Sequence, residues 1–227
     1  MTEQTGINMD RNTQYNTKGF VLLKELLPRE ITGAYLAIMQ KAIGDAPEKQ
    51  QRFRMNALAV SQPSLELFSN HFPFSLALLW GLTPTMQEIT GEQLLPAYAY
   101  GRVYGRGAQL NVHNDRPSNE HSLSLTLGYS DDAVWDLWID SKRLEDGETD
   151  AATPEWTFNE QDYVCLKMNP GDAVAYQGVH HRHARAAPNP NRWSAHLFMG
   201  WVNKNGKHKD HAFDGLALPP PPNFFLD

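Results

Sequence analysis

Two potential metal ligands lie one residue apart in the segment Val112-His113-Asn114-Asp115. In a β-strand, residues i and i+2 point to the same side, so the His113 imidazole and the Asp115 carboxylate can converge on one ion. A His-x-Asp pair also arises often by chance, and a surface pair is its usual explanation. The pair therefore indicates a metal site only if a further ligand returns to it from elsewhere in the chain.

A histidine cluster later in the chain can supply that ligand. His180, His181 and His183 follow a tight turn and a short apolar strand in the segment Gly171 to Gly178. Two histidines and one carboxylate leave open positions on a metal, which suits Fe(II) in oxygen chemistry because a cosubstrate and O2 must both bind. Structural zinc prefers a closed shell that usually contains cysteine, and this chain has only Cys165. By strand parity, His181 and His183 are both candidates for the distal ligand.

An arginine and a serine open the last predicted strand and share one of its faces. Arg192 lies nine residues after His183 and two residues before Ser194. A planar guanidinium suits the distal carboxylate of a dicarboxylic acid, and the hydroxyl beside it can donate one more hydrogen bond. This pair predicts a clamp for an acidic cosubstrate. We expect His196, further along the same strand, to be a surface or packing residue.

These residues need a scaffold of short strands, and the hydrophobic pattern predicts one. Helical spacing predicts a helix from Pro28 to Gly44, broken helical segments from Leu65 to Leu82, and a short helix from Thr83 to Gly91. After Leu94 the period changes to that of strands, separated by Gly and Pro turns. This order is typical of a mainly β jelly roll with N-terminal helices packed outside one sheet. The predicted strands are Lys18 to Leu23, Tyr98 to Tyr104, Ser122 to Leu127, Val134 to Ile139, Tyr163 to Met168, Ala173 to Gln177 and Trp193 to Val202.

In this order and spacing, the motifs resemble the Fe(II)/2-oxoglutarate-dependent dioxygenase superfamily, in its prolyl-hydroxylase-like branch. The resemblance covers roughly residues 18–203 and rests on few positions. Its core is His113-x-Asp115, the distant His183 and Arg192-x-Ser194. Further similar segments are Lys18 to Leu23, Leu27-Pro28-Arg29-Glu30, Tyr104-Gly105-Arg106-Gly107 and Gly171 to Tyr176.

The resemblance implies a double-stranded β-helix of the cupin type that binds Fe(II), 2-oxoglutarate and O2. It implies that His113, Asp115 and His183 hold the iron, and that a substrate is hydroxylated with release of succinate and CO2. The spacing from His183 to the arginine matches the family, which favours His183 over His181 as the distal ligand. His181 remains the rival.

For the cosubstrate, the resemblance implies that Arg192 and Ser194 hold the distal carboxylate of 2-oxoglutarate. Members of the family often place a tyrosine against the cosubstrate, and Tyr104 is the candidate here. Arg185 forms a His-x-Arg pair with His183 that related sequences also contain. Arg185 therefore remains the rival anchor.

Length and composition favour one domain over residues 1–227, which the resemblance implies is a dioxygenase domain. We expect a loose arm at 1–17, a helical support region at 18–93, a jelly-roll core at 94–203, and a tail at 204–227 that contains a polyproline II segment. A net charge of -6 argues against nucleic-acid binding. The apolar stretches are short for a membrane span, and the polar N-terminus lacks a signal-peptide pattern. We therefore expect a cytoplasmic protein.

Three arginines, Arg102, Arg106 and Arg116, flank the predicted site. A cationic mouth favours a small anionic metabolite as substrate, although Arg102 could instead pair with an internal acid. One alternative is a peptidyl hydroxylase of the prolyl-hydroxylase type. Another is a non-catalytic, cupin-like metal-binding protein, against which the arginine clamp argues. The sequence leaves the oligomeric state open.

Overall fold

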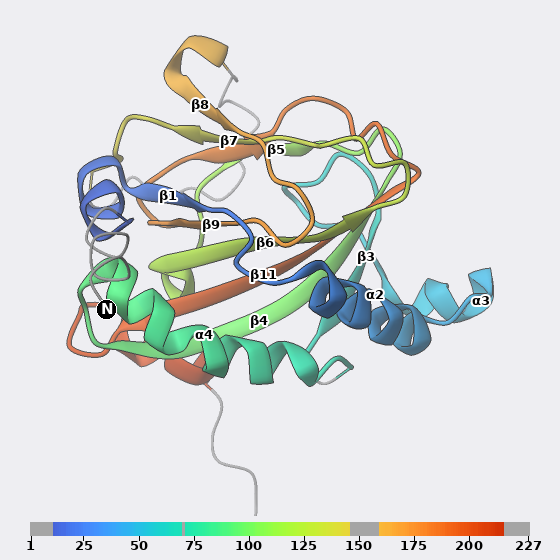
Figure 1. Ribbon diagram of the computed structural model, residues 1–227, viewed down its shortest axis with the longest axis horizontal. Helices are drawn as coiled ribbons and strands as arrows, with labels where there is room; N and C mark the ends of the chain where they lie inside the picture. The colour runs from blue at the N-terminus through green and yellow to red at the C-terminus, as the bar shows by residue number, and fades with distance from the viewer. Residues whose placement is uncertain (1–10, 70, 146–158, 216–227) are drawn as a thin grey trace, which may run out of the picture.

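Two β-sheets face each other, and helices cover the outer side of the larger sheet (Figure 1). The computed structural model describes residues 11–69, 71–145 and 159–215. The larger sheet consists, in spatial order, of β1 (Phe20–Leu23), β9 (Ala173–Tyr176), β6 (His121–Tyr129), β11 (Trp193–Asn203), β4 (Leu94–Gly105), β3 (Ser64–Phe68) and β2 (Arg54–Met55). The smaller sheet consists of β5 (Leu110–His113), β10 (His183–Arg185), β7 (Leu137–Asp140) and β8 (Tyr163–Leu166). This arrangement confirms the predicted jelly roll.

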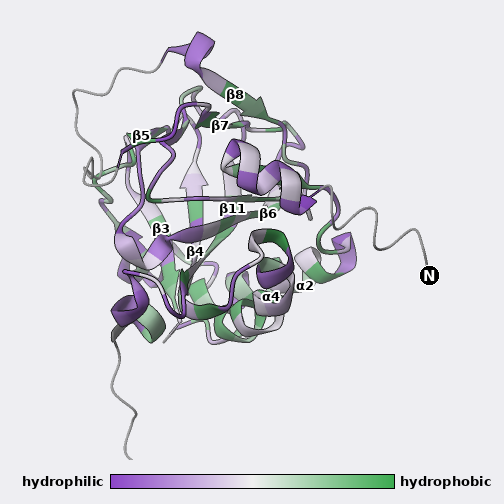
Figure 2. Ribbon diagram, turned by 90° about the vertical axis from the view of Figure 1, so that its left-hand side faces the viewer, coloured by the Kyte–Doolittle hydropathy of each residue, from purple (hydrophilic) through white to green (hydrophobic). Residues whose placement is uncertain are grey.

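The helices lie mostly beside the larger sheet, where both apolar and polar residues occur along them (Figure 2). The helices are α2 (Arg29–Ile43), α3 (Pro47–Gln50) and α4 (Phe74–Thr90), with short 3-10 helices η1 (Gln51–Phe53), η2 (Pro117–Asn119), η3 (Glu160–Asp162) and η4 (Lys209–Gly215). In the described ranges, none of the helices has the length and apolar character that a membrane crossing needs.

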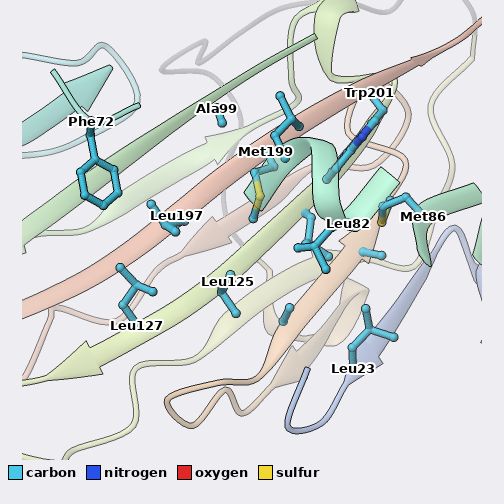
Figure 3. Close-up of a cluster of buried hydrophobic side chains, with 14 of the residues drawn as sticks. Leu23, Phe72, Leu82, Met86, Ala99, Leu125, Leu127, Leu197, Met199 and Trp201 are labelled. Atoms are coloured by element: carbon cyan, nitrogen blue, oxygen red, sulfur yellow. The ribbon is translucent and has the colours of Figure 1, made fainter. Parts of the chain in front are cut away.

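The main hydrophobic core lies between the larger sheet and the helices. Leu125 and Leu127 of β6 and Leu197 of β11 belong to this core, together with Leu82 and Met86 of α4 (Figure 3). Because side chains alternate along a strand, the residues between these leucines point the other way, into the space between the two sheets. On β6 these inward residues are Ser122, Ser124 and Thr126, all buried. The interior of the barrel is therefore unusually polar.

The N-terminal arm is more ordered than predicted. Residues 11–18 are helical, and only residues 1–10 of the expected arm lie outside the described ranges. Tyr15 is buried, and its hydroxyl lies 2.8 Å from Nδ1 of His121. The Asn12 side chain donates to the backbone carbonyl of Ile89, at 2.9 Å. One buried aromatic residue and these polar contacts hold the helix against the barrel, which a polar sequence does not reveal.

The segment before the jelly-roll core also differs from the prediction. The expected broken helices between Leu65 and Leu82 are wrong, because Ser64–Phe68 forms β3 and a single helix runs from Phe74 to Thr90 with Pro84 inside it. Proline removes the hydrogen bond to residue i−4, here Trp80, which is 68% exposed. The helix ends at Gly91 (φ 78°), as predicted. The polyproline segment at 218–222 lies outside the described residues.

Candidate metal centre

Three of the predicted ligands lie together at one end of the smaller sheet. His113 ends β5 and His183 begins β10, and the two residues are direct cross-strand partners. Ligand atoms of His113, Asp115 and His183 all lie within 4.8 Å of one another. Nε2 of His183 is 3.5 Å and Nε2 of His113 is 4.0 Å from Oδ1 of Asp115. Two imidazoles and one carboxylate that converge in this way can hold one metal ion and leave positions open.

Backbone carbonyls orient both imidazoles. Nδ1 of His113 lies 2.8 Å from the carbonyl oxygen of Asn111, and Nδ1 of His183 lies 3.1 Å from that of His181. If each Nδ1 carries the proton and donates it to that carbonyl, each Nε2 presents a lone pair to the centre. Burial, together with the nearby His183, lowers the pKa of His113 to about 4. His113 is therefore neutral at pH 7, as a metal ligand must be.

The carboxylate is held from both sides. Oδ2 of Asp115 accepts a hydrogen bond of 2.6 Å from the Ser122 hydroxyl. The backbone N–H of Asp115 donates to the carbonyl of Gly178 at 2.8 Å. A side chain at Gly178 would collide with that carboxylate and with Ser122. The Tyr176 hydroxyl lies 3.5 Å from Nε2 of His183. Ser122 and Tyr176 are polar neighbours of the centre that sequence reasoning missed, although both follow from inward strand parity.

The rival ligand His181 points away from the cluster. Its Nδ1 lies 2.9 Å from the carbonyl oxygen of Asp140, and its ring meets Phe20 edge-on at 6.3 Å. Its Nε2 abuts Gly19, where a side chain would overlap the ring. His181 is buried as a packing residue. Within the described residues, the only group with metal-ligand geometry is the one that contains His183.

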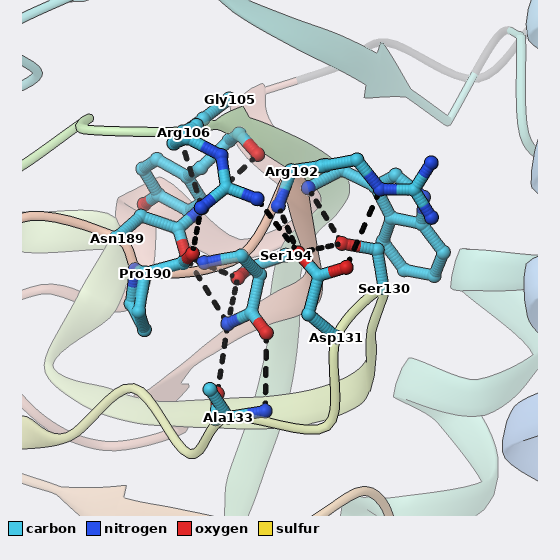
Figure 4. A network of polar contacts seen from close by, with 12 residues as sticks. Gly105, Arg106, Ser130, Asp131, Ala133, Asn189, Pro190, Arg192 and Ser194 are labelled. Atoms are coloured by element: carbon cyan, nitrogen blue, oxygen red, sulfur yellow. Dashed lines mark hydrogen bonds and ion pairs between the residues drawn. The ribbon is translucent and has the colours of Figure 1, made fainter.

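Arg192 does not join this centre but lies in a polar network with Asp131 (Figure 4). Its side chain is 71% exposed, its Nε lies 3.3 Å from Oδ1 of Asp131, and its backbone N–H donates to Oδ2 of the same residue. The pairing of β11 with its neighbours begins at Trp193, so Arg192 lies beyond the sheet rim and outside the barrel. Ser194 is buried, but its hydroxyl donates to the Asn189 side chain at 2.7 Å. The expected buried clamp at Arg192-x-Ser194 is therefore not formed.

Tyr104, the third predicted cosubstrate contact, does lie inside the barrel. It is fully buried, and its ring meets Trp135 edge-on at 5.0 Å. Its hydroxyl accepts a hydrogen bond of 3.2 Å from Arg102. Arg102 in turn forms a buried ion pair of 2.8 Å with Glu66, so the internal pairing left open by the sequence is the one observed.

The buried guanidinium of the barrel belongs to Arg185, the rival anchor. Arg185 lies on β10 two residues after His183, and none of its side chain is exposed. It donates to the Trp135 carbonyl, and its Nη2 lies 3.6 Å from Sδ of Met168 and 3.4 Å from Nδ1 of His196. Its Nε has no hydrogen-bond partner. Across the described residues, no carboxylate lies within ion-pair distance of this charge.

Comparisons with known proteins bear on the fold. No family model matches the chain, and no curated protein is similar enough in sequence to count as a relative. Solved structures do match. The carbocyclase SnoK from nogalamycin biosynthesis superposes with a TM-score of 0.65 at 12% identity, over 86% of this chain and 83% of its own. The epimerase SnoN, in complex with Fe3+, alpha ketoglutarate and nogalamycin RO, gives 0.62 at 11% identity, over 88% and 84%.

A Pseudomonas putida prolyl-4-hydroxylase gives a TM-score of 0.55 at 17% identity, over 88% of this chain and 100% of its own. Sequence identities this low are evidence of a shared fold and give no information about the substrate. SnoK and SnoN are both described as non-haem, alpha-ketoglutarate-dependent enzymes. The chain therefore shares the fold of these enzymes.

Proposed function

We propose that this chain is an Fe(II)- and 2-oxoglutarate-dependent oxygenase that acts on a small molecule. In this proposal His113, Asp115 and His183 hold the iron. Bound Fe(II) and 2-oxoglutarate supply the oxidising chemistry, in which the 2-oxo acid becomes succinate and CO2 while the substrate is oxidised by O2. The protein positions these groups and excludes competing reactions. The neutral imidazole of His113 and the Ser122 hydrogen bond to Asp115 prepare these ligands for a divalent ion.

The observation that carries the proposal is the uncompensated charge of Arg185 inside the barrel. A buried charge is costly unless it is paired, and a guanidinium is complementary to a carboxylate. Residues two apart on a strand are separated by roughly 7 Å. A five-carbon dicarboxylate can bridge that distance, with its 2-oxo acid end at the metal beside His183 and its distal carboxylate at Arg185. We therefore propose Arg185, in place of Arg192, as the anchor.

Polar side chains also point into the space between the two sheets, on the side where Arg185 lies. Ser124 on β6 and His196 on β11 are fully buried, and Oγ of Ser124 and Nε2 of His196 have no hydrogen-bond partner. Tyr104 closes the same end of the barrel, where its ring lies 5.8 Å from that of His196. Buried polar atoms without partners are rare in folded proteins. His196 contacts Arg185, and an unpartnered polar atom next to a buried charge fits an acidic cosubstrate.

The arginines near the predicted site bear on the charge of the substrate. Each arginine that suggested an anionic substrate is already paired: Arg102 with Glu66, Arg106 with Asp131, and Arg116 with Asp214. The charge argument for an anionic substrate therefore loses its basis, whereas a small molecule is still favoured. SnoK and SnoN, by their names, act in nogalamycin biosynthesis. A peptide substrate, a single-domain organisation and a cytoplasmic location stay predictions.

The test is an assay of the Fe(II)-loaded protein for conversion of 2-oxoglutarate to succinate, first alone and then with a panel of small molecules and proline-containing peptides. We expect succinate formation that requires both Fe(II) and O2, and stimulation by a small molecule. Asp115→Ala should abolish it, whereas His181→Asn, which alters a buried histidine outside the cluster, should not. Metal binding without any binding or turnover of 2-oxoglutarate would instead support the non-catalytic, cupin-like alternative.

A further inference from the structure

His196 lies in the middle of the larger sheet, with its side chain on the inward face of β11. It is fully buried, and four aromatic rings surround it at centroid distances of 5.8 to 6.3 Å. These rings belong to Tyr104, Tyr129, Trp135 and Phe198. A packing role would explain the burial of the ring. It does not explain why an imidazole, which carries one donor and one acceptor, occupies this position.

The contacts of His196 fix which of its nitrogens carries the proton. Nδ1 lies 3.4 Å from Nη2 of Arg185 and 3.3 Å from the Thr126 hydroxyl. An arginine side chain has only donors, so Nδ1 must be the acceptor and the proton is on Nε2. Burial, and then the charges of Arg185 and Arg102, lower the pKa of His196 well below its ordinary value. The ring is therefore neutral at pH 7, with one N–H group at Nε2.

That N–H group has no acceptor in the protein. Nε2 of His196 is inaccessible and forms no hydrogen bond, and the same holds for Nε of Arg185 and Oγ of Ser124. These atoms come from β11, β10 and β6, and all three side chains are directed into the space between the sheets. A carboxylate is acceptor-only and offers about four lone-pair sites. Because Arg185 and His196 contact each other, one carboxylate can accept from both of them.

We propose that Nε2 of His196 donates a hydrogen bond to the distal carboxylate of the cosubstrate, alongside the guanidinium of Arg185. This inference rests on the proposed function and adds a second, neutral donor to the anchor. His196 also accepts from Arg185 through Nδ1, so it orients the guanidinium and binds the same carboxylate. The pair selects a 2-oxo acid with a carboxylate at its far end over one that ends in a methyl group.

The experiment compares two ligands that differ only at that end, 2-oxoglutarate and 2-oxopentanoate. Their affinities for the Mn(II)-loaded protein are measured by calorimetry, so no turnover is needed. From the strength of a hydrogen bond to a charged group, we expect His196→Phe to weaken the binding of 2-oxoglutarate by about tenfold to a hundredfold. The same variant should leave the affinity for 2-oxopentanoate within about twofold. The matched control is His121→Gln, which changes a buried histidine of β6. His121 contacts Tyr15 and Glu92 rather than Arg185 or His196, so this variant should alter neither affinity.

Two conservative variants separate direct donation from an indirect effect through Arg185. The amide N–H of His196→Gln can take the place of Nε2, whereas the amide oxygen of His196→Asn can take the place of Nδ1 and keep the bond from Arg185. Direct donation predicts that Gln restores more 2-oxoglutarate affinity than Asn. The reverse order would overturn the inference, as would an equal loss for both ligands in His196→Phe. A wild-type protein that does not prefer 2-oxoglutarate over 2-oxopentanoate would refute the proposed function itself.

Discussion

Exchanging Arg185 and Arg192 in turn for methionine gives two variants with the same chemical change and opposite expected results. Arg185 is fully buried and lacks a carboxylate partner, whereas Arg192 is 71% exposed and already paired with Asp131. If Arg185 holds the distal carboxylate, Arg185→Met should remove most of the affinity for 2-oxoglutarate. Arg192→Met should remove little, because an exposed ion pair contributes at most about 1 kcal/mol and lies outside the barrel.

The magnitude follows from ligand linkage. A ligand at 100 times its Kd stabilises the folded protein by about 2.7 kcal/mol. For a domain of this size, each kcal/mol shifts Tm by about 2–4 °C, so 2-oxoglutarate should raise Tm by roughly 5–11 °C. Truncating one partner of a buried charge pair costs about 2–5 kcal/mol, which weakens Kd by at least roughly thirtyfold. At the same ligand concentration, less than about 0.9 kcal/mol of stabilisation then remains for Arg185→Met.

The assay is a thermal unfolding series with Mn(II) held constant and 2-oxoglutarate varied. The quantity compared is the ligand-induced shift in Tm, because the substitutions also change the stability of the ligand-free protein. A shift that disappears in Arg185→Met and persists in Arg192→Met supports the anchor proposed above. A shift that persists in Arg185→Met and disappears in Arg192→Met would show that the exposed arginine moves inward on binding, and the reasoning from burial would be refuted.

Three further predictions concern the ligands and the barrel interior. His183→Ala should lower metal affinity by more than about a hundredfold, and His181→Asn should lower it by less than about threefold. Both affinities are measured by competition with a metallochromic chelator. Equal losses would contradict the choice of His183 as the distal ligand. Gly178→Ala should weaken metal binding by about tenfold or more, since its methyl group displaces the carboxylate of Asp115, and unchanged affinity in a folded variant would contradict this. The pKa of His196 is lowered in the folded state. The stability that the neutral imidazole contributes is therefore fully present above about pH 6.5 and is lost as the pH falls below that value. Urea unfolding at several pH values should show a smaller acid-induced loss for His196→Gln than for the wild type, and an identical loss would argue against a neutral buried imidazole.

Much of the barrel could be predicted from alternation alone. Polar and apolar residues alternate from Ser122 to Leu127, small or apolar residues alternate with tyrosines and Arg102 from Ala97 to Tyr104, and both segments are strands in the structure. The same parity placed His113 and Asp115 on one side of their segment. Alternation fails where a segment is too short to show a period. Ser64–Phe68 has five residues between helical segments, and it becomes a strand because β4 offers an edge for pairing.

The anchor could not be chosen from sequence for a different reason. Arg185 and Arg192 both follow His183, and both have a parity that allows an inward direction. Two features separate them. The pairing of β11 begins at Trp193, so Arg192 precedes the strand, and Asp131 lies beside Arg192 and pairs with it. Both facts depend on segments distant in sequence. The spacing from His183 to Arg192 is therefore a weaker guide to the buried arginine than the immediate His-x-Arg pair, whose two members share one strand.

The most direct test of the central claim is an anaerobic absorption titration of the Fe(II)-loaded protein with 2-oxoglutarate. Chelation of Fe(II) by a 2-oxo acid produces a visible charge-transfer band that neither component gives alone. If the chain binds both groups as proposed, we expect a saturable band with one equivalent of 2-oxoglutarate per chain. The band should be lost in Asp115→Ala and should appear only at much higher ligand concentration in Arg185→Met. Tight iron binding without such a band, or a band unaffected in both variants, would contradict it.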